Sequence, residues 1–278
     1  MTKKAWFITG CATGFGRALA EAALARGAQV AVTDRSREAV ADLGERYPDT
    51  ALALGLDVTK PDQVRGALDA AFDRFGRLDV LVNNAGYAVQ AAVEEADMPA
   101  VRAMFEVNFF GMVDIIQAAL PRLRAQGDGH IINFASVGGR VSGPLVALYC
   151  ASKYAVEGLC EGLALEVAGF GIKVTAVEPG AFATRFGATA VPPKNPVAAY
   201  EPLHEQTRAM VSGLAQGNPA DLAAAILELA DAQNPPLRFV GGCDAYAMIE
   251  QSLKTQAAEM EAWRDLSNRA NLVALQMA

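Results

Sequence analysis

The chain has 278 residues, of which 52% are hydrophobic and 20% are charged, and its formal net charge is −7. A chain this long and this apolar can bury a large core, which argues against disorder and suits one α/β domain. The acidic balance argues against a nucleic-acid partner. We therefore expect a single folded domain over residues 1–278.

The cysteines and histidines are not arranged as metal ligands. The four cysteines show no ligand spacing: Cys11, Cys150, Cys160 and Cys243. The two histidines, His130 and His204, lie far apart in the sequence, so we expect no metal site. Nothing before the first apolar run resembles a secretory signal, and we expect a cytoplasmic protein that does not enter a membrane.

Apolar runs alternate with amphipathic stretches, which is the order of parallel strands joined by crossover helices. The predicted strands lie near 5–9, 29–33, 51–56, 79–83, 130–134, 173–178 and 237–241. The predicted helices lie near 15–26, 36–46, 61–75, 98–125, 150–168 and 219–231. We expect an α/β fold: a Rossmann-type, doubly wound, seven-stranded parallel sheet with helices on both faces.

A glycine-rich turn follows the first predicted strand, and a helical pattern resumes after it. Glycines let the backbone approach a pyrophosphate, and the next helix presents unpaired N–H groups to it. An ordinary tight turn is the alternative. The turn predicts a dinucleotide phosphate site made by Gly10, Thr13, Gly14, Phe15 and Gly16.

The second predicted strand ends at Asp34, where a carboxylate can accept hydrogen bonds from an adenosine ribose. The same carboxylate repels a 2′-phosphate and so favours NAD over NADP. Arg35 follows directly and could clamp a phosphate instead. Asp34 could also cap the next helix, a role open to Ser36 as well. We predict NAD as the cofactor, with NADP as the alternative.

Tyr149 and Lys153 lie four residues apart, on one face of a predicted helix. A tyrosine titrates near pH ~10, and a positive charge beside it favours the phenolate and lowers its pKa. An exposed helix surface can carry the same pair by chance. Ser136 lies at the end of a predicted strand, thirteen residues before the tyrosine.

Several short motifs occur in one order along residues 4–245. They are the glycine turn at 9–16, Asp57-Val58, Asn83-Asn84-Ala85-Gly86, Asn108, Ser136, Tyr149-x-x-x-Lys153 and Pro179-Gly180. In this order the chain resembles the simple, single-domain branch of the short-chain dehydrogenase/reductase family. The three-residue gap between the first two glycines of the turn separates it from the commoner dinucleotide fingerprint.

The resemblance implies further nucleotide contacts, all of them after predicted strands: Asp57, Val58, Asn84, Ala85, Gly86, Pro179, Gly180 and Thr184. Asp57 would meet the adenine, although it could also cap the helix near Pro61. The turn after the fourth strand would contact the adenosine-side ribose, while Asn83 holds the sheet. Pro179-Gly180 and Thr184 would meet the nicotinamide, with a plain turn as the alternative. Tyr149 and Lys153 would also contact the cofactor.

The resemblance also implies the catalytic roles. Tyr149 would be the general acid in ketone reduction and the general base in alcohol oxidation. Lys153 would tune the tyrosine and bind the nicotinamide ribose, and Ser136 would bind the substrate oxygen. Asn108 interrupts an apolar helix face, so it needs hydrogen-bond partners. These would be a water and a carbonyl in a proton relay from Lys153, or partners in the core.

Apolar residues near the serine and at the start of a later insertion could line a pocket with Ser136 and Tyr149: Val137, Leu145, Phe182 and Phe186. They predict a hydrophobic or aromatic substrate, although they could equally belong to the core. Region 185–218 breaks the strand–helix rhythm and is predicted to be a substrate lid at the carboxyl edge of the sheet. We expect His204, within it, to be exposed.

The chain continues for about 35 residues after Gly242. Residues 246–266 carry an imperfect apolar stripe at helical spacing. We therefore predict a C-terminal helical extension, 243–278, that covers the protein's own core near the lid. A helix there would obstruct the last-strand surface through which tetrameric relatives pair, leaving the helices near 98–125 and 150–168. We predict a homodimer through these helices, with a homotetramer as the alternative.

These patterns predict an NAD(P)-dependent oxidoreductase that acts on CH–OH groups and interconverts a secondary alcohol and a ketone. One alternative is a dinucleotide-binding regulatory protein that has lost the chemistry, although Ser136, Tyr149 and Lys153 are all present. A sugar epimerase or dehydratase is a weaker alternative. Those relatives usually have a different glycine spacing and a larger C-terminal domain.

Overall fold

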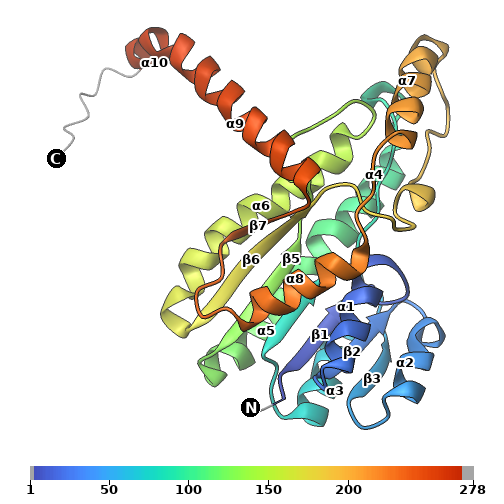
Figure 1. Cartoon of the computed structure of the whole chain (residues 1–278), viewed down its shortest axis with the longest axis vertical. Coiled ribbons are helices and arrows are strands. Elements are labelled where there is room, and N and C mark those ends of the chain that lie inside the picture. The colour runs from blue at the N-terminus through green and yellow to red at the C-terminus, as the bar shows by residue number, and fades with distance from the viewer. Residues whose placement is uncertain (1–2, 271–278) are drawn as a thin grey trace.

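The computed structural model describes residues 3–270. A parallel sheet of seven strands runs through the molecule in the order β3-β2-β1-β4-β5-β6-β7 (Figure 1). The strands are β1 (Ala5–Thr9), β2 (Gln29–Asp34), β3 (Ala51–Gly55), β4 (Val80–Asn83), β5 (Gly129–Phe134), β6 (Ile172–Pro179) and β7 (Arg238–Gly241). The strand order reverses between β1 and β4, and open α/β sheets bind ligands at such a switch point.

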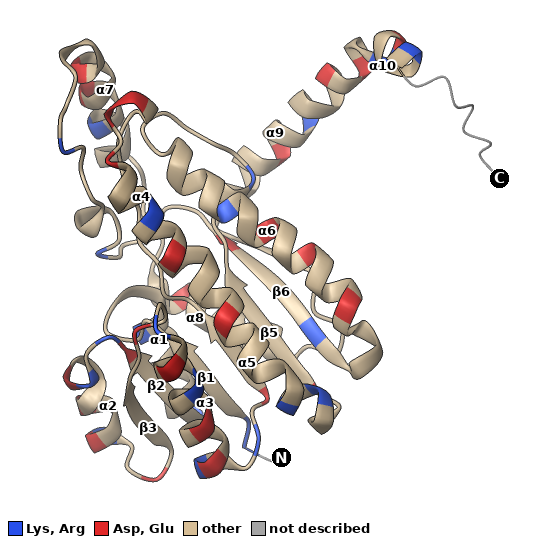
Figure 2. Ribbon diagram, turned by 180° about the vertical axis from the view of Figure 1, so that it is seen from behind, with Lys and Arg blue, Asp and Glu red and all other residues tan. Residues whose placement is uncertain are grey.

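Helices cover both faces of the sheet (Figures 1 and 2). One face packs against α1 (Gly14–Ala25), α2 (Ala41–Arg46) and α8 (Pro219–Asp231). The other packs against α3 (Pro61–Phe75), α5 (Gly111–Gln126) and α6 (Ala147–Val167). The predicted Rossmann-type, doubly wound α/β fold is therefore confirmed.

The remaining helices are α4 (Met98–Phe105), α7 (Glu201–Ser212), α9 (Cys243–Ala262) and α10 (Arg264–Ala270). Short 3₁₀ turns are η1 (Arg37–Val40), η2 (Val93–Glu95), η4 (Val137–Gly139), η5 (Ala168–Phe170), η6 (Gly187–Thr189) and η7 (Ala198–Tyr200). Local signals place these elements well. In α3, for example, Pro61 starts the first turn and Gly76 ends the helix with φ +77°, a left-handed conformation that glycine adopts readily.

The long helix predicted at 98–125 is divided by a π-helical turn, η3 (Glu106–Phe110). The whole stretch Met98–Gln126 is long and apolar enough to cross a membrane by length and composition alone. Its apolar residues Ile115 and Leu123, however, are buried in the core against the sheet. We therefore interpret it as a core helix, and the π turn places Asn108 at its inner face.

The C-terminal extension runs away from the body of the molecule (Figure 1). In α9 only Ala245 and Ile249 are buried, whereas Met260 is 73% exposed and Trp263, directly after the helix, is 64% exposed. The expectation that this segment covers the protein's own core is therefore wrong for 250–270, since only the root of α9 packs against the body, and 271–278 lie outside the described residues. A continuous helix of 20 residues is about 30 Å long and cannot fold back over the lid.

Candidate active site

The glycine turn has the geometry of a phosphate cradle. Gly10 and Gly14 have φ of +72° and +62°, which side chains rarely adopt. A Cβ atom on Gly16 would lie 2.3 Å from the carbonyl oxygen of Gly10, so a larger residue cannot fit there. Thr13 makes no side-chain bond to the start of α1, which leaves the first N–H groups of that helix without a side-chain partner. These free donors fit the pyrophosphate of a dinucleotide.

The side chain of Asn84 holds the glycine turn in place through hydrogen bonds to its backbone. Its Nδ2 donates to the carbonyl oxygens of Thr9 at 2.8 Å and Gly10 at 3.1 Å. The hydroxyl oxygen of Thr9 accepts the backbone N–H groups of Asn84 and Ala85, both at 3.0 Å. Asn84 was predicted to contact the cofactor, and its side-chain nitrogen is bonded to the protein's own backbone. Asn83 bonds Asn133 across the sheet, as expected of a structural residue.

Asp34 is the last residue of β2, and its Oδ2 accepts from the backbone N–H of Ala12 at 3.1 Å. The carboxylate thus lies beside the glycine turn and caps no helix, because η1 begins after Ser36. Arg35 is exposed and borders an open groove of about 440 Å³ together with Asp57. An acidic side chain, Asp34, and a basic one, Arg35, therefore both lie near the predicted ribose position.

Asp57 and Val58 follow β3. The Oδ1 atom of Asp57 accepts from the backbone N–H of Thr59 at 3.0 Å and from its hydroxyl at 2.7 Å. Asp57 therefore closes a local turn, and the residue that precedes α3 is Lys60. Val58 is buried, and its backbone approaches Gly111 so closely that a Cβ there would lie 2.7 Å from the Val58 oxygen.

The segment predicted to meet the nicotinamide is held by a residue that the sequence reasoning missed. Pro179 ends β6, and the backbone N–H of Ala181 donates to Asp244 Oδ2 at 2.7 Å. A Cβ on Gly180 would lie 2.3 Å from the same carboxylate oxygen. Asp244 lies in the first turn of α9, and its position directly after a predicted strand was the available signal. Thr184 lies close to Gly14, so this segment closes against the glycine turn.

Ser136 and Tyr149 lie side by side. The Cβ position at Gly138 is 3.4 Å from both Ser136 Oγ and Tyr149 Cε1. The Oγ atom also accepts from the backbone N–H of Gly138 at 3.0 Å, which orients the hydroxyl. Burial raises the pKa of Tyr149 to about 12, and the Ser136 side chain opposes this increase.

Lys153 follows one turn later on α6 and is buried. Its Nζ donates to the carbonyl oxygen of Phe134 at 2.7 Å and lies 6.0 Å from the centroid of the Tyr149 ring. Burial lowers the pKa of Lys153 to about 8. The pKa of Tyr149 therefore shifts in the direction opposite to the expected one, because burial disfavours the phenolate.

Asn108 is fully buried and has partners on both sides. Its Nδ2 donates to the carbonyl oxygen of Tyr87 at 2.9 Å and to the hydroxyl of Ser152 at 3.1 Å. Its Oδ1 accepts from the backbone N–H of Tyr87 at 3.0 Å. The Cβ position at Gly86 lies 3.0 Å from Asn108 Oδ1 and 3.6 Å from Lys153 Nζ, which places the two polar groups together. The relay through a water stays a prediction.

Two of the residues predicted to line the pocket follow Ser136 in the chain. Val137 is half-buried in η4. Leu145 is buried, and its φ of +63° is the only positive value of a non-glycine residue among 3–270. Its carbonyl oxygen accepts from the backbone N–H of Ala91 at 2.7 Å. Such a conformation is unfavourable and persists where neighbours enforce it, commonly beside functional sites.

The two phenylalanines at the start of the predicted lid occupy different places. The Phe182 ring lies 5.1 Å from that of Phe15 between centroids, so it joins the packing around α1. The Phe186 ring lies 5.5 Å from that of Tyr149 and is 37% exposed. Phe186 therefore borders the Tyr149 phenol, whereas Phe182 packs between the glycine turn and the predicted lid.

Region 185–218, the predicted lid, is held against the rest of the chain by a buried pair. Glu95 accepts from His204 Nε2 at 2.8 Å and from the backbone N–H of Val197 at 2.8 Å. The expectation that His204 is exposed is therefore wrong. Its partner lies 109 residues away in the chain, so no local pattern could reveal the contact.

A second buried cluster lies behind the Ser136 segment. Glu178 accepts from Arg140 Nη1 at 2.9 Å, and Glu157 accepts from Arg238 Nε at 2.9 Å. Burial, and next the neighbouring Glu178, raise the pKa of Glu157 to about 7. Glu157 lies one turn after Lys153, so this cluster fixes α6 to the neighbouring strands β6 and β7.

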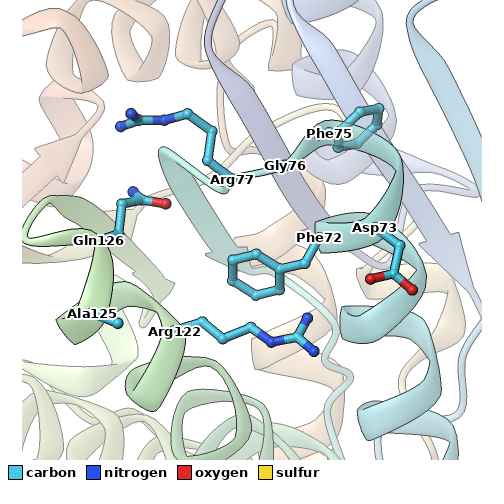
Figure 3. Close-up of a pocket in the computed structure, with 8 residues that line it drawn as sticks. All are labelled: Phe72, Asp73, Phe75, Gly76, Arg77, Arg122, Ala125 and Gln126. Carbon is cyan, nitrogen blue, oxygen red and sulfur yellow. The ribbon is translucent and has the colours of Figure 1, made fainter.

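A hollow of about 740 Å³ lies at the opposite edge of the sheet, between the ends of α3 and α5 (Figure 3). Its two arginines are ion-paired, Arg77 with Asp79 and Arg122 with Asp69. It is therefore not the site of the motifs above. Across residues 3–270, no group of three or more His, Cys, Asp or Glu side chains is placed to hold a metal ion.

The chain is similar to known proteins over most of its length. The family model described as short chain dehydrogenase matches residues 4–195. Oxidoreductase BOA17 of Botryotinia fuckeliana (strain B05.10) is 38% identical over 268 residues, covering 95% of this chain and 98% of that protein.

Solved structures of short-chain dehydrogenases are also similar to this chain in sequence and fold. A short-chain dehydrogenase from Streptomyces avermitilis is 42% identical with a TM-score of 0.91, covering 97% of this chain and 100% of that one. A short chain dehydrogenase/reductase from Burkholderia phymatum, solved in complex with NAD, is 25% identical with a TM-score of 0.79, covering 91% and 95%. The chain therefore belongs to the short-chain dehydrogenase/reductase family of oxidoreductases.

Proposed function

We propose that the protein interconverts a secondary alcohol and a ketone on a hydrophobic or aromatic substrate, with NAD(P) as cofactor and Tyr149 as the acid/base. The observation that carries this proposal is the juxtaposition of the Ser136 hydroxyl and the Tyr149 ring, which both lie 3.4 Å from the Cβ position at Gly138. A substrate oxygen bound against the Ser136 hydroxyl and the Tyr149 phenol would meet one donor that orients it and one that can transfer a proton.

The residues divide the work as follows. A bound nicotinamide supplies the hydride in reduction and accepts it in oxidation. Ser136 holds the substrate oxygen, and Tyr149, a neutral phenol at pH 7 with its pKa raised to about 12, donates the proton to a ketone. Lys153 then stabilises the phenolate that remains, because its ammonium lies on the same face of α6. In oxidation Tyr149 takes the proton back.

The residues at the switch point fit a dinucleotide. The glycine turn leaves the first N–H groups of α1 free for phosphates, and the Asp34 carboxylate beside it could accept a hydrogen bond from a ribose hydroxyl. We propose NAD as the preferred cofactor, because the Asp34 carboxylate would repel a 2′-phosphate. Replacing Asp34 with Ala should raise the ratio of NADP to NAD turnover by about tenfold or more. A parent enzyme that already prefers NADP would contradict this assignment.

The Phe186 ring, which lies 5.5 Å from that of Tyr149 and is 37% exposed, supports a hydrophobic substrate. The test is a spectrophotometric screen of NADH and NADPH oxidation, and of NAD and NADP reduction, against a panel of aliphatic, aryl and polycyclic ketones and alcohols. Tyr149→Phe is run beside each active pair. Tight NADH binding with no turnover across the panel would favour the regulatory alternative instead.

A further inference from the structure

Helix α9 carries an apolar seam that nothing in the described chain covers. The seam consists of Leu253, Gln256 and Met260 in α9 and of Trp263, the residue directly after the helix, at alternating spacings of three and four residues. Ile249, one step earlier in the same series, is buried against the body. The face that packs on the body at the root of α9 therefore continues outward into solvent, as Figure 1 shows for the helix as a whole.

The period of the seam indicates what covers it. A repeat of 3.5 residues is the spacing that keeps one helix in register with another helix. Membrane-surface helices instead carry many Lys and Arg residues on the polar face. Residues 243–270 have five acidic and three basic side chains, and both signs lie along α9 in Figure 2. A helix of a protein partner therefore fits better than a lipid surface.

We propose that α9 pairs antiparallel with α9 of a second copy of this chain, across a two-fold axis near Ala257 and Ala258. A parallel pair is disfavoured, because the body already occupies the seam at Ile249 and a second body would have to lie beside it. In the antiparallel pair the two bodies lie at opposite ends, and a two-fold axis makes the interface self-complementary.

The side chains suit this register. When Leu253 of one copy faces Trp263 of the other, Gln256 faces Met260 and the apolar seam closes on itself. Glu250 then lies at the height of Arg264 of the other copy, which is the first residue of α10 and is ion-paired with Glu261 within its own chain. Glu259 falls beside its own counterpart, which is the one repulsive contact and gives the proposal a sharp test.

This interface differs from one through the long helices Met98–Gln126 and α6. It is also independent of the proposed chemistry, because none of its residues touches the reaction site. It does begin close to the cofactor segment, since Asp244 in the first turn of α9 holds the backbone N–H of Ala181.

The first experiment measures mass by light scattering coupled to size exclusion over a range of concentrations. The full chain should form a dimer near twice 29.2 kDa, or a tetramer if a second interface is also used. Met260→Glu should halve the measured mass of the assembly. Ala258→Glu, which adds the same charge on the opposite face of α9, should leave the mass unchanged. A monomeric parent chain, or an assembly that Met260→Glu does not change, would overturn the proposal.

The second experiment tests the register. Glu259→Gln removes the like-charge contact and should tighten self-association on the order of twofold, measured by sedimentation equilibrium. Ala257→Cys, in a Cys243→Ser background, should form a disulfide-linked dimer under mild oxidation. If Met260→Glu dissociates the assembly but Ala257→Cys does not cross-link, the seam docks on the body of the other copy and the helix pairing is overturned.

Discussion

Helix α6 buries charged side chains in two successive turns, and the two differ in whether they have a salt-bridge partner. Lys153 is 4% exposed, and its Nζ bonds one carbonyl oxygen, with no salt bridge among residues 3–270. Glu157 is 5% exposed, and it lies in a network with Glu178 and two arginines. A lone buried charge is unfavourable and persists where chemistry requires it, whereas the paired charges hold four chain segments together.

The same physical cause acts in both turns with opposite sign. Burial disfavours the charged form, so it lowers the pKa of Lys153 to about 8 and raises the pKa of Glu157 to about 7. Function is therefore expected to depend on the first turn and stability on the second. The predictions below test that separation.

The largest effect is expected at the reactive phenol. Tyr149→Phe should lower kcat by at least ~100-fold, because it removes the transferable proton and keeps the ring. NADH affinity, measured by fluorescence titration, should change little. Tyr154→Phe is the matched control, since Tyr154 is exposed on the same helix and bonds a backbone oxygen. A Tyr149→Phe enzyme that retains most of its kcat would remove the assigned mechanism.

In the paired turn, Arg238→Met should mainly affect stability. It removes the cation that bonds Glu157 and Glu161 and leaves a buried carboxylate without its partner. We expect a loss of about 2 kcal/mol in the free energy of unfolding, measured by urea titration, with kcat nearly unchanged below the transition. Arg208→Met, at an exposed ion pair of the lid, should have almost no effect on stability.

Lys153→Met should do the reverse. The buried ammonium is replaced by an apolar chain of similar length, so Tm should rise by a few degrees at pH 7. Turnover and NADH affinity should both fall, because the variant loses the ammonium that stabilises the Tyr149 phenolate and the proposed contact of Lys153 with the ribose. A variant that is less stable than the parent would show that Lys153 also has a structural role.

The smallest effect is a pH dependence of stability. The pKa of Glu157 is raised from 4.5 to about 7 in the folded state. Its contribution to the stability of the folded state is therefore complete below pH 4.5 and is lost as the pH rises through about 7. Thermal unfolding should show Tm falling over this window. Glu157→Gln cannot ionise and should show a shallower decline, while an identical slope in both proteins would exclude Glu157 as the cause.

Local patterns in the sequence were sufficient for the elements and for the order of the motifs. Strands such as β1 and β4 are continuous apolar runs, and α3 is bounded by a proline and a glycine, so their signals lie within a few residues of each other. The Ser136, Tyr149 and Lys153 cluster was likewise predictable, because each residue sits at a strand end or on a helix face that the pattern defines.

Tertiary structure decided what depends on residues far apart in the chain. The burial of His204 needs Glu95, the grip on Ala181 needs Asp244, and the raised pKa of Tyr149 needs the surrounding burial. The direction of α9 was also beyond local reasoning, since an amphipathic stripe is the same whether it faces its own body or another chain. Periodicity determines which face of an element is apolar, whereas long-range packing determines what that face meets.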